Sequence, residues 1–430
     1  MKAAEEFSLM RLYPLSLGRL AWLQARRGWG KLWRAPGVNA RFLIATAFFW
    51  SGAMALTEPY KALYLSRLGL SNLAIGGFFA LDMGLRVVGV VLGGFFAQRY
   101  GHKTTLLLFD FLSWTIPSLA LALATEPWHV YVATCLTASN AFLSGSVMQL
   151  LVEGTPEDNR TSLFALFTLT FVIPGIFLPA AAGWAVETWG VVPAMRVFFG
   201  VSVASTLAGG LWRMARLTES KAIKPKADLG ELMDDALRAA KHLVKQVQFG
   251  PVLACFLLAN LLMNLGRVYQ GLFLTKGLGL SDGLVGWTAT TGSAAFCVAS
   301  LFFVPKLKAG SEGRTFFHAS WVIALPALAL AFTRDWRLVL LTTVVGGAVA
   351  AVHGAILSER LANLFPRGAE GLAHALLSSV MQAAVALGLM LSGALFETRL
   401  SSFPYVTTLV PLAMAAFAWR LSKLEPAPVT

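Results

Sequence analysis

Ionisable side chains interrupt four long apolar stretches of the sequence. They are Glu58, Asp82 with Arg86, Arg267 and His353. A charge near the centre of a bilayer costs about 2.5 to 3.5 kcal/mol on insertion scales, so a charge kept there needs a partner, a water-filled cavity or a function. Intramembrane carboxyl groups often relay protons, which makes Glu58 and Asp82 the candidates for proton coupling.

The spacing of these charges predicts specific partners. Asp82 and Arg86 are four residues apart and can pair along one helix. Glu58 and Arg267 would lie at a common depth, roughly 15 Å below one surface at the helical rise per residue. They can pair with each other or contact a substrate directly. If Glu58 pairs instead with Lys61, Arg267 is an unmatched cation, which would favour an anionic or zwitterionic substrate.

Polar residues at helical spacing add candidates for substrate binding. Asn260, Asn264 and Arg267 recur every three or four residues and therefore share one helix face. The full candidate set contains six side chains: Glu58, Asn140, Asn260, Asn264, Arg267 and His353. The alternative for the asparagines is a structural one, because such residues often bond a neighbouring membrane helix. A lone helical histidine is likewise more often a packed residue than a ligand.

The elements that must position these residues are membrane helices. The chain has 430 residues, of which 57% are hydrophobic and 13% charged, and its mean hydropathy is +0.66. Apolar runs of about 20 residues or more, long enough to cross roughly 30 Å of hydrocarbon, recur along it. The sequence therefore predicts an all-α membrane protein with twelve transmembrane helices, at 42–66, 72–98, 104–124, 128–152, 161–187, 192–215, 250–276, 282–305, 315–333, 336–360, 369–397 and 402–421.

The basic residues predict the orientation of the chain. Its net charge of +13 arises mainly in loops rather than in a nucleic-acid-binding patch. With twelve crossings, 26 Lys and Arg fall on the side of the termini and six on the other side. The positive-inside rule then places both termini in the cytoplasm. We expect the protein in the plasma membrane or inner membrane of the cell.

The polar segments divide the chain into domains. Residues 1–41 are basic and rich in tryptophan, which suits a segment lying on the cytoplasmic membrane surface. We expect a six-helix bundle over 42–215, a cytoplasmic linker with an amphipathic helix over 216–249, a second six-helix bundle over 250–421 and a cytoplasmic tail over 422–430.

An internal repeat relates the two predicted bundles. The sequence Leu-Gly-Leu-Ser occurs at 68–71 and again at 278–281, a displacement of 210 residues. The same displacement relates Pro156 to Pro366 and Gly183 to Gly393. Each landmark falls at the same point of a six-helix unit. Parallel six-helix repeats occur in transporters, where the substrate site lies between the halves near the membrane midplane.

A loop motif then suggests a family. The segment from Gly94 to Lys103 contains Gln98, Arg99 and Gly101, and it resembles the Gly-x-x-x-Asp-Arg-x-Gly-Arg-Lys loop of the major facilitator superfamily. The resemblance covers roughly residues 40–424. It implies two pseudo-symmetric six-helix bundles and a cytoplasmic gating loop made by Gly94, Gln98, Arg99, Gly101 and Lys103. Gln98 stands where the family usually has Asp, so the usual charged latch is altered.

These features together predict a secondary transporter that carries a small solute by alternating access. Coupling to a proton or another ion is expected to be possible, and the protein is expected to act as a monomer among membrane lipids. No Walker-type loop, catalytic group, cofactor motif or metal-ligand spacing is found, and Cys135, Cys255 and Cys297 are isolated. The alternatives are a drug or metabolite exporter of the same fold, a membrane-embedded lipid-modifying enzyme and a non-transporting sensor.

Overall fold

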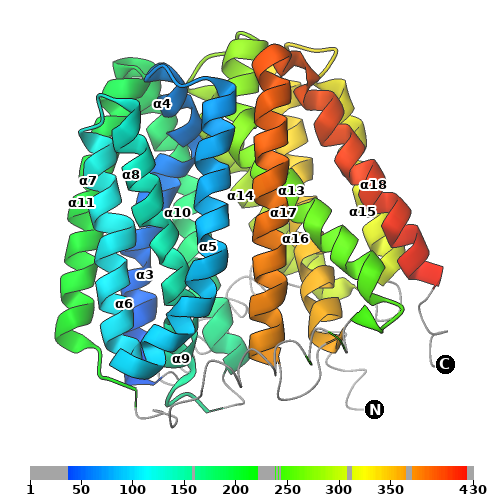
Figure 1. Cartoon of the computed structure of the whole chain (residues 1–430). Helices are drawn as coiled ribbons and strands as arrows, with labels where there is room; N and C mark the ends of the chain where they lie inside the picture. Colours follow the sequence, from blue (N-terminus) through cyan, green and yellow to red (C-terminus); the bar gives the residue numbers. More distant parts are fainter. Residues whose placement is uncertain are drawn as a thin grey trace, which may run out of the picture.

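The computed structural model of the chain describes residues 37–156, 160–220, 238, 241, 244–307, 312–364 and 370–423. All regular secondary structure among these residues is helical, as the sequence predicts. The helices run side by side in two bundles (Figure 1). Most of the segment 1–41, the predicted linker helix and the end of the tail lie outside the described residues.

The first bundle holds the helices that precede residue 220. It contains α3 (Val38–Thr57), η1 (Glu58–Tyr60), α4 (Lys61–Arg67), α5 (Asn72–Tyr100), α6 (His102–Asp110), η2 (Phe111–Thr115), α7 (Ile116–Ala122), α8 (Pro127–Ala138), η3 (Ser139–Leu143), α9 (Ser144–Val152), α10 (Arg160–Trp189) and α11 (Val191–Arg216). Several of these segments join end to end into one membrane-crossing helix. In this way α3, η1 and α4 make the first crossing, and Val38–Arg67 is continuous.

The second bundle holds the helices that follow residue 248. It contains α13 (Phe249–Leu272), η5 (Phe273–Gly277), α14 (Leu284–Phe302), η6 (Val304–Lys306), α15 (Glu312–Ala329), α16 (Trp336–Leu364), α17 (Glu370–Thr398), η7 (Leu400–Ser402) and α18 (Phe403–Lys423). In Figure 1 α3 begins and α18 ends at the same face of the molecule. We call the other face, where the two Leu-Gly-Leu-Ser turns lie, the turn face.

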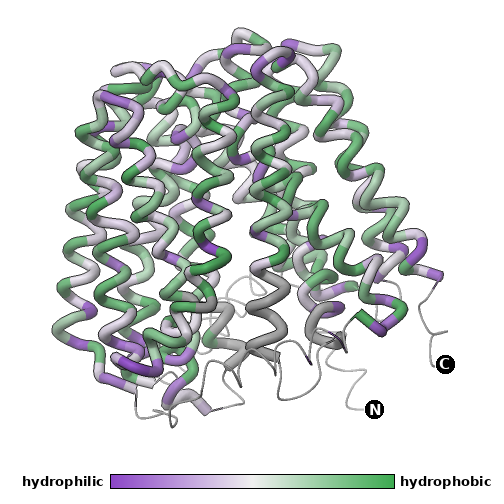
Figure 2. Tube along the Cα trace, in the orientation of Figure 1, coloured by the Kyte–Doolittle hydropathy of each residue, from purple (hydrophilic) through white to green (hydrophobic). Residues whose placement is uncertain are grey.

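Eleven helical segments among the described residues are long and apolar enough to cross a membrane. The predicted span at 315–333 corresponds to α15, which is not among the eleven. Glu312, Arg314 and His318 lower the hydropathy of its first two turns. The helix nevertheless contacts α16 and α18 along the bundle. Figure 2 shows the apolar residues along the helices and the hydrophilic ones gathered toward the two ends.

One irregular turn interrupts the first crossing of each half. Pro59 has no backbone N–H, and the helix tightens there into the 3-10 turn η1. In the corresponding crossing of the second half the chain forms a π-helical turn, Phe273–Gly277, which follows the residues that match η1. A π turn accommodates one extra residue in a helix. The displacement between the halves is consequently 209 before this turn, as for Glu58 and Arg267, and 210 after it.

The two bundles contact each other through matching helix pairs. Helix α5 packs on α17, and α10 packs on α14, while η1 and α4 contact α13. In the repeat α5 corresponds to α14 and α10 to α17, so the two pairs are equivalent contacts. Apolar side chains on the helices, such as Phe177, Leu325 and Leu391, are largely exposed. That surface suits contact with lipid tails.

Candidate solute-binding site

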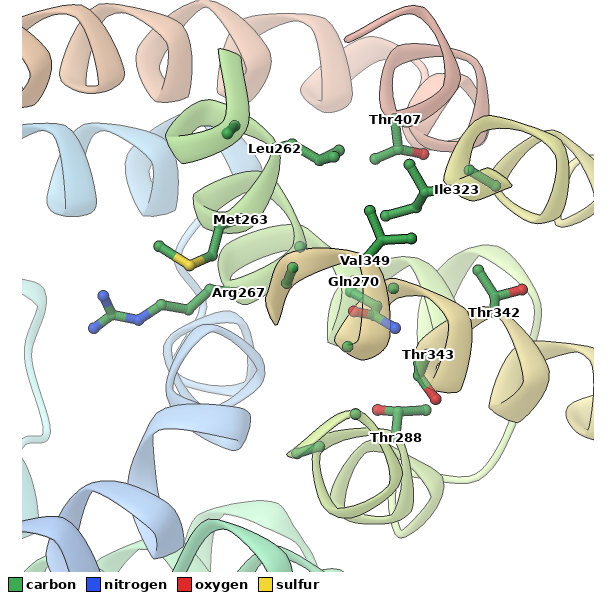
Figure 3. Close-up of a pocket in the computed structure, with 18 of the residues that line it drawn as sticks. Leu262, Met263, Arg267, Gln270, Thr288, Ile323, Thr342, Thr343, Val349 and Thr407 are labelled. Atoms are coloured by element: carbon green, nitrogen blue, oxygen red, sulfur yellow. The ribbon is translucent and has the colours of Figure 1, made fainter. Parts of the chain in front are cut away.

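A cavity of about 680 Å³ opens between the helices of the second bundle. Its walls come from α13, α14, α15, α16 and α18 (Figure 3). This volume lies within the range of about 300 to 1,000 Å³ that is usual for small-molecule sites. The walls are mainly apolar, with Phe256, Met263, Ile323 and Leu330 among them.

Uncharged polar side chains also line this cavity, among them four threonines and the amides of Asn260 and Gln270. Thr288 Oγ1 donates to Val285 O at 2.8 Å, Thr342 Oγ1 to Leu338 O at 2.9 Å and Thr407 Oγ1 to Phe403 O at 3.0 Å. These bonds lie within single helices and use the hydroxyl protons. What the hydroxyls still offer a ligand is their acceptor lone pairs.

An ion pair between the two bundles borders the cavity. Arg267 Nε donates to Glu58 Oε2 at 2.8 Å, and Arg267 Nη2 donates to the same oxygen. Lys61 Nζ lies 3.4 Å from Glu58 Oε1. Glu58 and Arg267 therefore pair with each other, which is one of the two predicted alternatives. The hypothesis that Glu58 pairs only with Lys61 is wrong, so an unmatched Arg267 cannot be the reason for an anionic substrate.

The second predicted pair is present as well. Arg86 Nε donates to Asp82 Oδ2 at 3.1 Å, one helical turn apart on α5. Asp82 is 5% exposed, and its Oδ1 atom has no hydrogen-bond partner among the described residues. Asp82 and Arg86 do not line the cavity of the second bundle.

The remaining candidates divide into two groups. Asn260 and His353 line the cavity, but His353 is buried, stacked on Phe316 at a centroid distance of 3.9 Å and 3.4 Å from Ser320 Oγ. Asn264 and Asn140 are not among the lining residues. Asn264 Nδ2 instead donates to Asn260 O at 2.8 Å, because its side chain turns back along α13.

The predicted gating loop lies at the face opposite the turn face. Gly101 has a φ of +93°, a conformation that favours glycine, and it separates α5 from α6. Gly94, Gln98 and Arg99 are exposed. The carboxylate that reaches this loop comes from Glu219, whose Oε1 accepts from the backbone N–H of Lys103 at 3.0 Å. Sequence reasoning missed Glu219 because it follows α11, far from the motif.

A buried tyrosine joins the two bundles near the turn face. Tyr60 is fully buried, and its hydroxyl donates to Gly283 O at 3.3 Å and accepts from Gly286 N–H at 2.7 Å. A Cβ atom added to Gly286 would lie 2.8 Å from this hydroxyl and 3.0 Å from Gly183 Cα. The glycines therefore permit α10, α14 and the tyrosine to meet closely.

Tyr269 occupies the matching position of the second bundle, 209 residues after Tyr60. Its hydroxyl donates to Leu389 O at 3.1 Å. A Cβ atom added to Gly76 would collide with that hydroxyl, and Gly393 lies beside both. The signal that could have revealed this pair is its displacement, which equals that of Glu58 and Arg267. It differs by one residue from the displacement of the Leu-Gly-Leu-Ser turns.

Further polar contacts tie the bundles together at the turn face. Arg67 Nη2 lies 2.9 Å from Asp282 Oδ2, the backbone N–H of Leu73 donates to Glu397 Oε2 at 3.0 Å, and Asn72 Nδ2 donates to Phe396 O at 2.9 Å. In the first and second of these contacts a charged side chain bridges the halves. The structure is thus closed at the turn face.

Comparisons with known proteins agree with this architecture. Residues 42–406 match the profile of the MFS_1 like family. The chain is 23% identical to the multidrug efflux pump Tap of Mycolicibacterium fortuitum over 418 residues, which covers 91% of this chain and 98% of that protein.

Solved structures show the same fold. The crystal structure of the nucleoside transporter NupG superposes with a TM-score of 0.68 at 14% identity, covering 90% of this chain and 99% of that one. A crystal structure of the peptide transporter POT in complex with sulfate gives a TM-score of 0.68 at 13% identity, covering 90% and 96% of the respective chains.

Proposed function

This chain belongs to the MFS_1 like family of transporters, and we propose that it moves a small solute across a cell membrane by rocking its first bundle against its second. The observation that carries this proposal is the position of the cavity. It lies beside the Glu58–Arg267 pair, and the bridging contacts at the turn face close the path on that side. Opening those contacts would expose the site to the side of the membrane at which the turn face lies.

The proposed orientation places both termini in the cytoplasm and the turn face outside. It rests on the asymmetry of Lys and Arg in the loops. The closed turn face then makes this the inward-facing state. Alternating access requires a second state in which the turn face opens and the opposite face closes.

The Glu58–Arg267 pair is proposed to stabilise one of these states rather than to serve only as a solute ligand. Glu58 and Arg267 come from different bundles and occupy equivalent positions of the repeat. A pair that forms in one arrangement of the bundles contributes only to that arrangement, so it shifts the balance between states.

Glu58 and Asp82 are the groups proposed to link transport to a proton. Asp82 has a buried carboxylate oxygen without a partner among the described residues, and such an oxygen can accept a proton. Glu58 borders the cavity and could exchange its ion pair for a proton. A pH gradient that drives uptake into vesicles in the wild type, and not in Asp82→Asn, would support this part of the proposal.

Export is the direction that one specific observation favours. The relative from Mycolicibacterium fortuitum is named a multidrug efflux pump, and the present cavity is apolar enough for amphiphilic compounds. Import of a metabolite remains the competing direction for the same fold.

The proposal is tested by transport with purified protein. A thermal-shift screen of metabolites and drugs would identify stabilising compounds, which are then used in counterflow assays with proteoliposomes. Saturable counterflow of a labelled hit supports the transporter. Stabilisation by ligands without any counterflow would contradict it and favour a sensor.

A further inference from the structure

The cavity lies inside one half of a molecule whose halves are related by a repeat. Apart from Glu58 and Pro59, every described residue that lines it belongs to the second bundle. Side-chain volume is one source of such an asymmetry between halves of the same fold. The repeat shows where the volumes differ between equivalent positions.

The register between α5 and α14 is fixed by their glycines. Gly76 and Gly286 are 210 residues apart, and each meets a tyrosine hydroxyl and a glycine of the other bundle. Two and three residues later, the register places Phe78 opposite Thr288 and Phe79 opposite Ala289.

These equivalent positions differ greatly in volume. Phe78 and Phe79 are each 2% exposed and pack edge to face at a centroid distance of 5.0 Å. They lie in the apolar core beside Lys61, whose Nζ is 5.5 and 5.9 Å from their ring centroids, and the Arg267 guanidinium of the second bundle lies 5.8 Å from the Phe79 ring centroid. Thr288 and Ala289 instead line the cavity. The second bundle thus has a threonine and an alanine at the wall of its cavity where the first bundle has two phenyl rings.

The residues that line the cavity indicate the chemical class of the solute that it binds. Its charged lining residues, Glu58 and Arg267, pair with each other at its border, where Glu58 also contacts Lys61, and the rest of the described lining carries no formal charge. Its threonine hydroxyls have donated their protons within their own helices and present acceptors. Burying a net charge in such walls would be costly without a partner. An uncharged solute with an apolar body and a hydroxyl or amide donor avoids that cost.

We infer that the second bundle alone binds the solute, among α13, α14, α15, α16 and α18, and that the solute is an uncharged amphiphile. The first bundle then opens and closes access to this site as it moves against the second. In this arrangement the solute travels with one half of the protein instead of being gripped equally by both. The inference rests on the proposed transport function and specifies the site and the substrate class within it.

Photolabelling of the full-length protein in lipid nanodiscs tests this directly. Three probes share one benzophenone scaffold and differ in charge: 4-(hydroxymethyl)benzophenone, 4-benzoylbenzylamine and 4-benzoylbenzoate. We expect saturable labelling to be strongest with the alcohol, and its adducts, located by peptide mass spectrometry, to lie on residues 256–407. Adducts shared evenly between the bundles, stronger labelling by the amine or the carboxylate, or no saturable labelling by any of the three would overturn the inference.

Two variants on α14 sharpen the test. Ala289→Phe copies Phe79 into the second bundle and should reduce saturable labelling by the alcohol about tenfold or more, a change that corresponds to about 1.4 kcal/mol of binding. Val298→Phe adds the same ring at a position that is 50% exposed and should leave labelling unchanged. If Ala289→Phe does not elute as a monodisperse protein, Ala289→Leu replaces it. Undiminished labelling in the folded variant contradicts the inference.

The two proposals can fail separately. Labelling confined to the second bundle in a protein that shows no counterflow would refute transport and keep the site. Counterflow together with labelling spread over both bundles would keep transport and refute the one-sided site.

Discussion

Replacing Tyr60 with phenylalanine should loosen the closed turn face. The hydroxyl makes two hydrogen bonds across the bundles, to Gly283 O and from Gly286 N–H, in a fully buried setting. Each such bond contributes about 0.5 to 1.5 kcal/mol, so their loss should cost the closed state about 1 to 3 kcal/mol. Gly286 N–H keeps its bond to Gly283 O at 3.1 Å, so no donor is left without a partner.

This cost applies to one state only, because the bonds join helices that separate when the turn face opens. The ratio of open to closed molecules should therefore rise by roughly 5-fold to 150-fold. Spin labels on Thr125→Cys and Ser401→Cys, in a background without native cysteines, would report the distance between the bundles by pulsed electron resonance. Both positions are exposed near the turn face.

A matched control lies one turn further along the same crossing. Tyr64 is also fully buried, and its hydroxyl donates to Leu121 O at 2.8 Å, within the first bundle. Tyr64→Phe should lower overall stability and leave the distance distribution unchanged. The reasoning is refuted if Tyr60→Phe and Tyr64→Phe shift the distribution equally, or if neither shifts it.

Three other substitutions give distinct outcomes. Glu58→Gln leaves Arg267 and Lys61 without their shared anion and should reduce transport. If the pair serves to stabilise one state, the charge swap Glu58→Arg with Arg267→Glu should restore part of the transport rate. No recovery in the swap would assign Glu58 to solute or proton binding. Asp110→Asn removes the carboxylate that lies 2.7 Å from the buried Arg213 guanidinium and should cost about 3 to 5 kcal/mol of stability. The double variant Asp110→Leu with Arg213→Met should recover most of that stability, as measured by thermal unfolding. Gly286→Ala places a methyl group against the backbone oxygen of Pro179, the Tyr60 hydroxyl and Gly183, and it should favour the open turn face. Gly77→Ala, which meets open space, should not. Equal distance distributions for the two variants would contradict the close contact.

The fold was largely predictable because membrane helices have a strong sequence signal. Long apolar runs gave the crossings, and the repeated Leu-Gly-Leu-Ser turns gave the relation between the halves. Among the described helices that correspond to predicted crossings, α15 has weak hydropathy, because Glu312, Arg314 and His318 occupy its first two turns. Its partners α16 and α18 supply the contacts that hydropathy does not measure.

The site was predictable only in part, for geometrical reasons. The common depth of Glu58 and Arg267 predicted that they could meet, and they do. The π turn at Phe273–Gly277 shifts the repeat by one residue and thereby conceals that Tyr60 and Tyr269 are equivalent. Asn264 has the right spacing for a cavity residue, but spacing defines a helix face and not what that face meets.

The cavity in the second bundle could not be predicted from the sequence, for a different reason. The volumes at Phe78, Phe79, Thr288 and Ala289 can be read from the sequence. Whether small residues leave a cavity or are filled by neighbours depends on the packing of five helices around them. Glu219 illustrates the same limit, since its contact with Lys103 joins segments that are 116 residues apart.

The central claim is that transport requires the turn face to open and close. Arg67 and Asp282 bridge the bundles there, so the cysteines of the double variant Arg67→Cys with Asp282→Cys can be joined by a short bismaleimide whose spacer contains a reducible disulfide. Counterflow in proteoliposomes should stop when the two cysteines are cross-linked and return after the spacer is reduced. Continued counterflow by the fully cross-linked protein would contradict alternating access.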